Sequence, residues 1–438
     1  MAEPSSHSWG PLLRRRPFAL LFSARTVARF GNNLGAVALV WYVYSATRSP
    51  IALTLVGLAE LLPSLTVGLF AGALVDRFDR RRTSGLTTLG RALSMAVLVG
   101  ATIAMGFHLT IVLAVVVVFS LLSSFMGPAT TVLLPQIVER SDLAPANAML
   151  QASENSVGIA GASLAGVVVA LLGIVPALML DAVSFVVGGA LVLAIRPSEV
   201  RPPSTPPRAA TTPAGLVSEI VEGARYLRGQ TGLLELTLSA LGLNFFTTLV
   251  GLFTVIYVAQ VLHAGALMFG VLNAVGFAGV VVGGLAAGAF HLTRRAGVLW
   301  ASAGLFFGAS YGALVIAPLL LGVGPWVLAT AIAVSLATGV FGGMIGTAWL
   351  STAQAIVPDE FQGRYFSLDN LGSFAATPIA QVTGGLLTAA RGVLVTYAVA
   401  AIGCLGVGGV FSTRKELRAL SYDPSKGGEG RPPVAKPR

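Results

Sequence analysis

The stretch Gly72-Ala73-Leu74-Val75-Asp76-Arg77-Phe78-Asp79-Arg80-Arg81-Arg82 decides the fold of this chain. It places six charged residues inside a sequence that is otherwise almost continuously apolar. Apolar runs precede it from 51 to 75 and follow it from 83 to 105, and each is long enough to cross a bilayer as a helix. We therefore interpret the charged stretch as a tight loop between two membrane spans.

The composition agrees with a polytopic membrane protein. Of 438 residues, 55% are hydrophobic and only 11% are charged, and the mean hydropathy is +0.82, unlike a soluble globular chain. A chain of this length accommodates about twelve spans of ~20 residues. The apolar stretches predict these spans at 18–44, 51–75, 83–105, 109–134, 146–171, 174–195, 233–261, 266–290, 297–318, 324–350, 365–388 and 392–412.

The basic residues are distributed as in a membrane protein with both termini in the cytoplasm. The net charge is +10, but the arginines flank spans and form no single patch, so nucleic acid is not an expected partner. With a cytoplasmic N-terminus, only Arg48 and Arg391 fall on the outer side, which follows the positive-inside rule. The cytoplasmic set comprises Arg14, Arg15, Arg16, Arg77, Arg80, Arg81, Arg82, Arg140, Arg294, Arg295, Arg364 and the basic residues of 196–228 and the tail.

A proline-rich segment divides the chain into halves. We expect a six-helix bundle at 1–196, a cytoplasmic linker at 197–232, a second six-helix bundle at 233–413 and a cytoplasmic tail at 414–438. The linker ends in an amphipathic helix, since apolar residues recur there at helical spacing. The bundles look like repeats, because Met126-Gly127-Pro128 and Met344-Ile345-Gly346 occupy corresponding positions.

No pattern for catalysis or for a cofactor is found in the sequence. It contains no phosphate-binding loop and no cysteine–histidine metal spacing, and its four histidines are scattered. The single cysteine, Cys404, lies in the last span, where packing is its expected role. We expect no enzyme, cofactor or metal site, so work must come from an ion gradient or from the gradient of a solute.

Ionisable residues inside spans are costly and point to function. Arg25 and Arg29 lie one turn apart on the first span, and Arg29 reaches a depth similar to that of Glu60 on the second. An Arg29–Glu60 pair could be structural, or Glu60 could be a carboxylate whose protonation changes during transport. Glu154 and Asp369, at related positions of the two halves, are the other candidate proton sites.

Several uncharged polar residues are candidates for lining a cavity. Asn244 is the main one, and Asn155, Gln260 and Gln381 are weaker candidates. Glycines at 158, 161 and 166 allow a neighbouring helix to approach the fifth span closely.

The charged loop resembles the Gly-x-Leu-x-Asp-Arg-x-Gly-Arg-Arg motif after the second helix of the major facilitator superfamily, with Asp79 replacing the second glycine. Glu60-Leu61-Leu62-Pro63, Ala146-Asn147 and Asp181-Ala182-Val183-Ser184-Phe185 resemble the branch with macrolide-efflux proteins and the enterobactin exporter. The resemblance implies an all-α membrane protein with twelve transmembrane helices in two pseudo-symmetric six-helix bundles. It also implies proton-coupled export of an amphipathic small molecule, such as an antibiotic or siderophore, across a bacterial plasma membrane.

The same resemblance implies a conformational latch. Asp76 would accept hydrogen bonds at the N-terminus of the eleventh helix, and Arg80 would bridge to Glu139 or Asp142. The alternative is that these arginines only anchor the topology. The latch residues are Gly72, Asp76, Arg77, Arg80, Glu139 and Asp142. Arg91 and Asp181, on helices that the family places outside, are expected to support packing.

Other transport functions remain open. An uptake symporter for a polar nutrient would share the fold and the loop motif, and a lipid flippase or a non-transporting scaffold is also conceivable. The expected partners are a small-molecule substrate, protons and the lipid bilayer, and the chain is expected to act as a monomer.

Overall fold

The computed structural model describes residues 10–75, 78–200, 225, 227–357 and 359–420. These residues form α-helices and short 3₁₀ turns, with no strand among them. They group into two compact units, Met1–Arg48 with Leu55–Ala210, and Ser49–Thr54 with Thr211–Arg438. Most of the proline-rich linker and of its predicted amphipathic helix lies outside the described residues.

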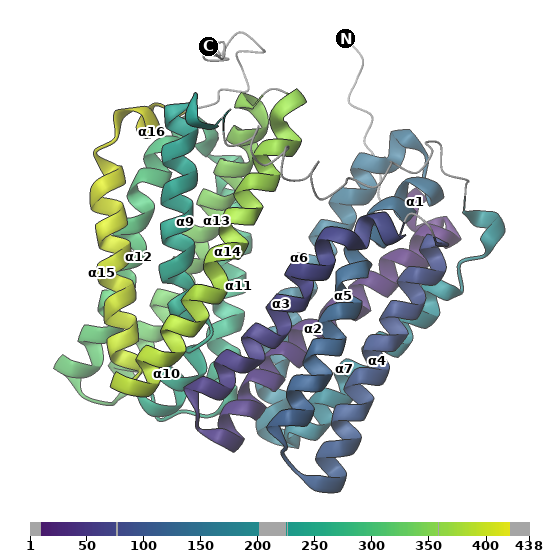
Figure 1. Cartoon of the computed structure of the whole chain (residues 1–438), viewed down its shortest axis with the longest axis horizontal. Helices are drawn as coiled ribbons and strands as arrows, with labels where there is room; N and C mark the ends of the chain where they lie inside the picture. Colours follow the sequence, from purple (N-terminus) through teal and green to yellow (C-terminus); the bar gives the residue numbers. More distant parts are fainter. Residues whose placement is uncertain (1–9, 76–77, 201–224, 226, 358, 421–438) are drawn as a thin grey trace. The chain divides into compact units, whose positions relative to one another are not determined.

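The helices of the first unit form a bundle (Figure 1). They are α1 (Gly10–Arg14), α2 (Arg16–Thr47), α3 (Pro50–Val75), α4 (Arg80–Met105), α5 (Leu109–Ile137), α6 (Leu143–Leu172) and α7 (Ile174–Leu193), with the 3₁₀ turns η1 (Arg140–Asp142) and η2 (Pro197–Glu199). The first residues of α3, up to Thr54, group with the second unit. Helix α2 packs against both α6 and α7, and α4 packs against α5 and α7.

The second unit has helix pairs that correspond to those of the first. Its elements are α9 (Thr231–Gly251), α10 (Thr254–Gln260), α11 (Ala266–Ala289), η3 (Leu292–Arg295), α12 (Ala296–Leu321), α13 (Pro325–Ile356), α14 (Asp359–Arg391), α15 (Val393–Ser412) and α16 (Lys415–Ala419). Helix α12 packs against α13 and α15, as α4 packs against α5 and α7. Helix α11 packs along α13, and α9 contacts both α14 and α15.

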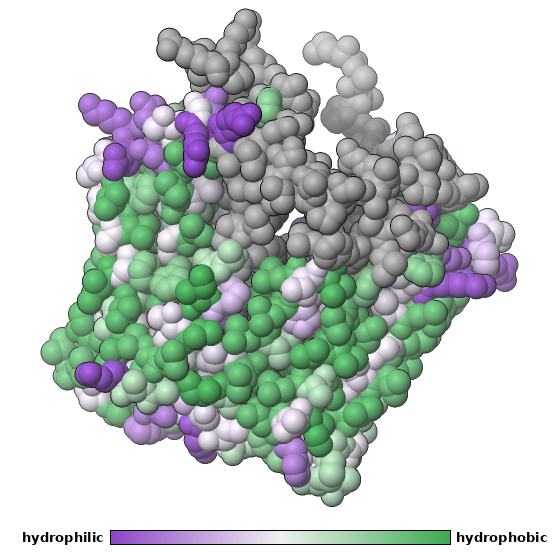
Figure 2. All heavy atoms as spheres, in the orientation of Figure 1, coloured by the Kyte–Doolittle hydropathy of each residue, from purple (hydrophilic) through white to green (hydrophobic). Residues whose placement is uncertain are grey.

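Ten helices of the described residues are long and apolar enough to cross a membrane. The two other long helices, α2 and α14, have 32 and 33 residues, and they coincide with the first and eleventh predicted spans. Apolar side chains cover the visible helix faces in Figure 2, and many are strongly exposed, as Leu171 at 77% and Trp326 at 75% show. Such surfaces suit lipid, because helices satisfy their backbone hydrogen bonds internally.

Single glycines make two of the connections between helices very short. Gly173 is the only residue between α6 and α7, and Gly392 is the only one between α14 and α15. Their φ angles are +88° and +86°, a region that other residues rarely adopt. Each glycine therefore reverses the chain within one residue.

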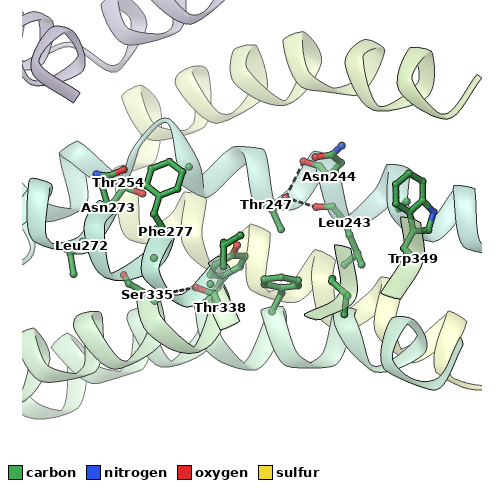
Figure 3. Close-up of a pocket in the computed structure, with 18 of the residues that line it drawn as sticks. Leu243, Asn244, Thr247, Thr254, Leu272, Asn273, Phe277, Ser335, Thr338 and Trp349 are labelled. Carbon is green, nitrogen blue, oxygen red and sulfur yellow. Dashed lines mark hydrogen bonds between the residues drawn. The ribbon is translucent and has the colours of Figure 1, made fainter. Parts of the chain in front are cut away.

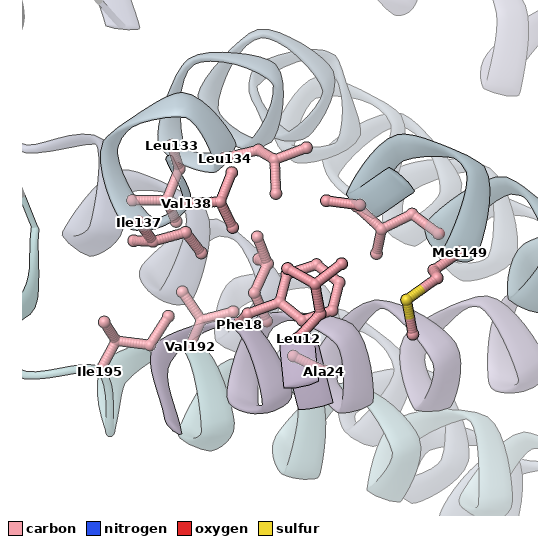
Figure 4. Packing of buried hydrophobic residues seen from close by; sticks show 13 residues of the cluster. Leu12, Phe18, Ala24, Leu133, Leu134, Ile137, Val138, Met149, Val192 and Ile195 are labelled. Atoms are coloured by element: carbon pink, nitrogen blue, oxygen red, sulfur yellow. The ribbon is translucent and has the colours of Figure 1, made fainter. Parts of the chain in front are cut away.

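The core of the first unit includes a cluster that joins α1, α2, α5, α6 and α7 (Figure 4). Phe18 and Leu133 are fully buried in it, and Met149 is 3% exposed. Close contact of α2 with α6 depends on Gly161, where an added Cβ atom would lie 2.6 Å from the carbonyl oxygen of Phe30. The predicted close approach of a helix to these glycines is thus confirmed at Gly161.

Candidate functional site

The charged loop separates α3 from α4. Gly72 belongs to the last turn of α3, although its surroundings are not described, and Asp76 and Arg77 lie outside the described residues. Asp79 is the N-cap of α4, and its Oδ1 accepts a hydrogen bond of 2.9 Å from the main-chain N–H of Arg82. Asp79, which stands where the family motif has a glycine, therefore caps α4, a role that aspartate performs well.

Glu139 and Asp142, the predicted partners of Arg80, are both held by Arg15. Its Nη1 atom lies 3.2 Å from Glu139 Oε1 and 2.9 Å from Asp142 Oδ2. These side chains are 28–54% exposed, so each pair contributes little to stability by itself. The network ties the end of α5 and the start of α6 to the beginning of α2. The pairing of either acid with Arg80 stays a prediction.

A second basic residue fixes the turn after α7. Arg16 Nη1 donates to both carboxylate oxygens of Glu199 at 2.9 and 2.8 Å, and Nη2 donates to the carbonyl oxygen of Ala194. The main-chain N–H of Arg196 also donates to Glu199. This N–H and the charge of Arg16 hold the pKa of the Glu199 carboxyl below its usual value.

An ion pair within the predicted spans joins α2 to α6. Arg25 Nη2 contacts Glu154 Oε1, and the two side chains are 24% and 19% exposed. Beside them, the hydroxyl groups of Thr26 and Ser153 share a hydrogen bond of 2.6 Å. Both residues of the pair were predicted as functional, but the pairing itself was not.

The predicted Arg29–Glu60 pair is not present among the described contacts. Both side chains are exposed, and the described salt bridge on this face of α2 is made one turn earlier by Arg25. The carbonyl oxygen of Glu60 accepts a hydrogen bond from the hydroxyl of Ser120. Asp369 belongs to α14, and its side chain lies outside what the structure describes.

A cavity of about 600 Å³ lies in the second unit, between α9, α10, α11, α12 and α13 (Figure 3). Its aromatic lining residues are Phe277, Trp300, Phe307, Tyr311 and Trp349. Its polar lining residues are Asn244, Thr247, Thr254, Asn273, Ser335 and Thr338. No acidic or basic side chain is among the described lining residues.

The polar groups of the cavity differ in their freedom to bind a solute. The hydroxyl of Thr247 donates to the carbonyl oxygen of Leu243 at 2.9 Å, and Asn273 Nδ2 donates to the carbonyl oxygen of Phe269 at 2.8 Å. The side-chain amide of Asn244 makes no hydrogen bond with another described residue. It therefore offers donors and an acceptor to the cavity, as was predicted for a lining residue.

A smaller cavity of about 150 Å³ shares Thr254 and Tyr311 with the larger one. Two stacked rings border it, Tyr257 and Tyr397, whose centroids lie 4.9 Å apart. The hydroxyl of Tyr397 is 3.2 Å from Thr254 Oγ1, and that of Tyr257 donates to the carbonyl oxygen of Leu314. Buried tyrosines thus extend the neutral, aromatic character of the site.

Comparison with known proteins identifies the family. A family model of the Major Facilitator Superfamily matches residues 21–380. The chain belongs to this superfamily. The multidrug efflux pump Tap of Mycolicibacterium fortuitum is 28% identical over 426 residues, which cover 93% of this chain and 98% of Tap. The uncharacterized MFS-type transporter YfiS of Bacillus subtilis is 26% identical over 90% of this chain and 92% of YfiS.

Solved structures support the same fold. A bacterial homologue of the iron transporter ferroportin, in an inward-facing state, has a TM-score of 0.69 at 16% identity and covers 92% of this chain and 100% of its own. A POT family transporter in complex with 5-aminolevulinic acid has a TM-score of 0.69 at 13% identity, with coverage of 90% and 95%. These structural similarities show the all-α fold, and the family model assigns the chain to the Major Facilitator Superfamily of membrane transporters.

In this superfamily member, the described structure brings together only some of the predicted site residues. Arg25 forms an ion pair with Glu154, and Asn244 lines the cavity. Glu139 and Asp142 both form ion pairs with Arg15. Sequence reasoning missed the roles of Arg15, Arg16 and Glu199. Their spacing along the chain carries no signal, because 183 positions separate Arg16 from Glu199. The signal for Asp79 was available, since aspartate directly before a helix is a common cap.

Proposed function

We propose that this superfamily member exports amphipathic small molecules, such as antibiotics or siderophores, across the bacterial plasma membrane by alternating access. The observation that carries the proposal is the cavity of the second unit, which combines aromatic rings with neutral hydrogen-bonding groups. Its volume suits a drug-sized solute, and such pockets bind mainly through apolar contact with a few polar anchors. The relatives named multidrug efflux pump Tap support the same direction of transport.

The lining favours amphipathic solutes over polar nutrients. A charged nutrient transferred from water needs opposite charges or many hydrogen bonds in its site. Aromatic rings such as Trp300 and Phe307 instead offer large contact areas. Trp300 has a fixed orientation, because its Nε1 donates to Ser239 Oγ at 2.6 Å. Only Tyr311 among the described lining residues carries an ionisable group, and it is neutral at ordinary pH.

Proton coupling is the second part of the proposal. Binding of a proton to Glu154 would remove its charge and weaken its attraction for Arg25, so α2 and α6 could separate. Loss of the proton would restore the pair. Ionisable residues that face each other within a membrane bundle are expected at such sites. Glu60 and Asp369 remain alternative carriers, and the latch role of Asp76 stays a prediction.

Transport can be tested first in cells. A strain that lacks its endogenous exporters, and that expresses this chain, should resist compounds from a panel of antibiotics and metal-chelating metabolites. The Asn244→Ala variant should lose part of this resistance, since one lost hydrogen bond costs about 1 kcal/mol, or about fivefold in affinity. Asn147→Ala is the matched control, because Asn147 is exposed and its amide donates to the carbonyl oxygen of Leu143.

Purified protein in liposomes then tests direction and coupling. A compound found in the cell assay should be moved against its gradient when a pH gradient is applied, and Asn244→Ala should need a higher concentration of it. Solute accumulation in cells under an inward proton gradient would favour the uptake symporter instead. Movement of phospholipids without solute transport would favour a flippase, and both outcomes contradict the proposal.

The proposed topology has both termini in the cytoplasm. Single cysteines at Ser49 and Gly392 should react with an impermeant thiol reagent added outside the cell. Cysteines at Ser84, Thr205 and Gln362 should react only after the membrane is opened. Labelling of Thr205→Cys from outside would contradict the arrangement, because this position tests whether an even number of spans precedes it.

A further inference from the structure

A buried carboxyl group of the first unit occupies a groove made by two glycines. Asp181 of α7 is only 2% exposed and lies against Gly31 and Gly35 of α2. A Cβ atom at Gly35 would overlap the Asp181 carboxyl group, and one at Gly31 would lie 3.1 Å from its Oδ1. The absence of side chains at these two positions therefore creates the space that the carboxyl group fills.

None of the described residues donates a hydrogen bond to this carboxyl group. Asp181 Oδ1 is enclosed and has no partner among the described residues. The nearby hydroxyl of Ser184 is committed elsewhere, since it donates at 2.7 Å to the main-chain oxygen of Asp181. A charged carboxylate buried without hydrogen-bond donors is very costly, and such a group becomes neutral instead.

The nearest charged side chain is turned towards other partners. Arg91 of α4 is 5% exposed, and its guanidinium lies over the rings of Phe119 and Phe185, with its Cζ 4.4 and 4.1 Å from their centroids. Nη2 donates to Asn32 Oδ1 at 2.7 Å, and Nη1 lies 3.0 Å from Met126 Sδ. The described residues include no salt bridge from Arg91 to an acid.

Arg91 nevertheless acts electrostatically on Asp181, and it is the charged group that does so among the described residues. Arg29 of α2 and Glu60 of α3 act in turn on Arg91, while Glu154 of α6 is paired with Arg25. Asp181 and Arg91 thus form a second set of buried ionisable residues, distinct from Arg25 and Glu154 and enclosed by α2, α4 and α7.

We propose that Asp181 is a proton-binding site, which holds its proton in this conformation and releases it when Arg91 turns from Asn32 to the carboxyl group. In that step the O–H bond of the acid breaks, its electron pair stays on the carboxylate, and the proton passes to water admitted by the opened groove. Arg91 keeps its charge and neutralises the new carboxylate. Linkage of this step to export rests on the proposed function, whereas the protonated state does not.

Infrared spectroscopy of the full-length protein in lipid nanodiscs tests the protonated state without any substrate. At neutral pH the protein should show the C=O band of a protonated carboxyl group, and Asp181→Asn should abolish it. Glu139→Gln is the control, because this carboxyl group is 54% exposed and lies outside the predicted spans, and it should keep the band. Absence of the band, or its survival in Asp181→Asn, would overturn the proposal.

Two further measurements keep the test decisive. If Asp181→Asn does not fold, isotope-labelled aspartate in the unaltered protein should shift the band, and an unshifted band would exclude Asp181. In Arg91→Gln the band should persist to higher pH than in the unaltered protein, because the cation that favours the carboxylate is gone. An unchanged pH dependence would exclude Arg91 as the partner.

The link to transport is measured separately. In liposomes, Asp181→Asn should lose export driven by a pH gradient and retain exchange of solute without net proton movement. Gradient-driven export at the unaltered rate would show that Asp181 takes no part in coupling. Because the infrared band needs no substrate, failure of the export function itself would leave that part of the test intact.

Discussion

Removal of either charge of the Arg25–Glu154 pair should strongly destabilise the first unit. Loss of one partner from a fully buried pair costs ~3–5 kcal/mol, whereas an exposed pair contributes ~0–1 kcal/mol. The two side chains are 24% and 19% exposed, so they lie much nearer the buried limit. We therefore expect Glu154→Gln and Arg25→Gln each to lower the free energy of unfolding by about 3 kcal/mol, because each leaves the opposite charge without its partner.

The double variant distinguishes a true pair from two independent charges. With both charges removed, no unpaired ion remains, so the combined cost should be smaller than the sum of the single costs by about 2 kcal/mol. Unfolding can be followed by tryptophan fluorescence in mixed micelles as the fraction of denaturing detergent is raised. Glu139→Gln is the exposed control, since its side chain is 54% exposed, and it should cost less than about 1 kcal/mol. Single costs that add to within about 0.5 kcal/mol would refute the pairing.

The remaining predictions concern packing, pH and the loop. Gly161→Val should lower the free energy of unfolding by about 1–3 kcal/mol, because the added Cβ atom would lie 2.6 Å from the Phe30 carbonyl oxygen. Gly158→Val should cost less, and equal melting temperatures of the two variants would contradict this. The lowered pKa of the Glu199 carboxyl contributes stability that is fully present above the unfolded pKa of about 4.3 and is lost as pH falls through the folded pKa. In Glu199→Gln the free energy of unfolding, measured at a series of acid pH values, should therefore depend less on pH than in the unaltered protein. Asp76→Asn should impair transport at unchanged membrane insertion, and normal flux at matched expression would reject the latch.

Much of this architecture follows from local patterns in the sequence. Each predicted span overlaps helical segments of the described structure, with the span at 233–261 divided between α9 and α10. This agreement arises because apolar length and the charges between spans are properties of short segments. The charged loop after Val75 resembles the family motif, and the family model confirms the membership that this resemblance implied. Asn244, which the sequence offered as a candidate for lining a cavity, borders the cavity of the second unit.

Only the tertiary structure decided which charged residues meet. Arg25 and Arg29 share one face of α2, so sequence spacing cannot tell which of them reaches an acid. The choice depends on how α2 is rotated and tilted against α6, and the contact at Gly161 brings these helices together beside Glu154. In the same way, Arg15 holds Glu139 because the beginning of α2 lies beside the end of α5.

The burial of Asp181 was likewise invisible in the sequence. Small residues such as Gly31 and Gly35 let helices approach closely, but their positions in the sequence do not specify which side chain fills the groove. That side chain is set by packing of α7 against α2, more than a hundred positions away. The sequence alone determined the membrane class, the helices and the family, because these depend on local composition and periodicity. The ion pairs, the cavity and the enclosed carboxyl group depend on contacts between distant segments, which only the packed helices define.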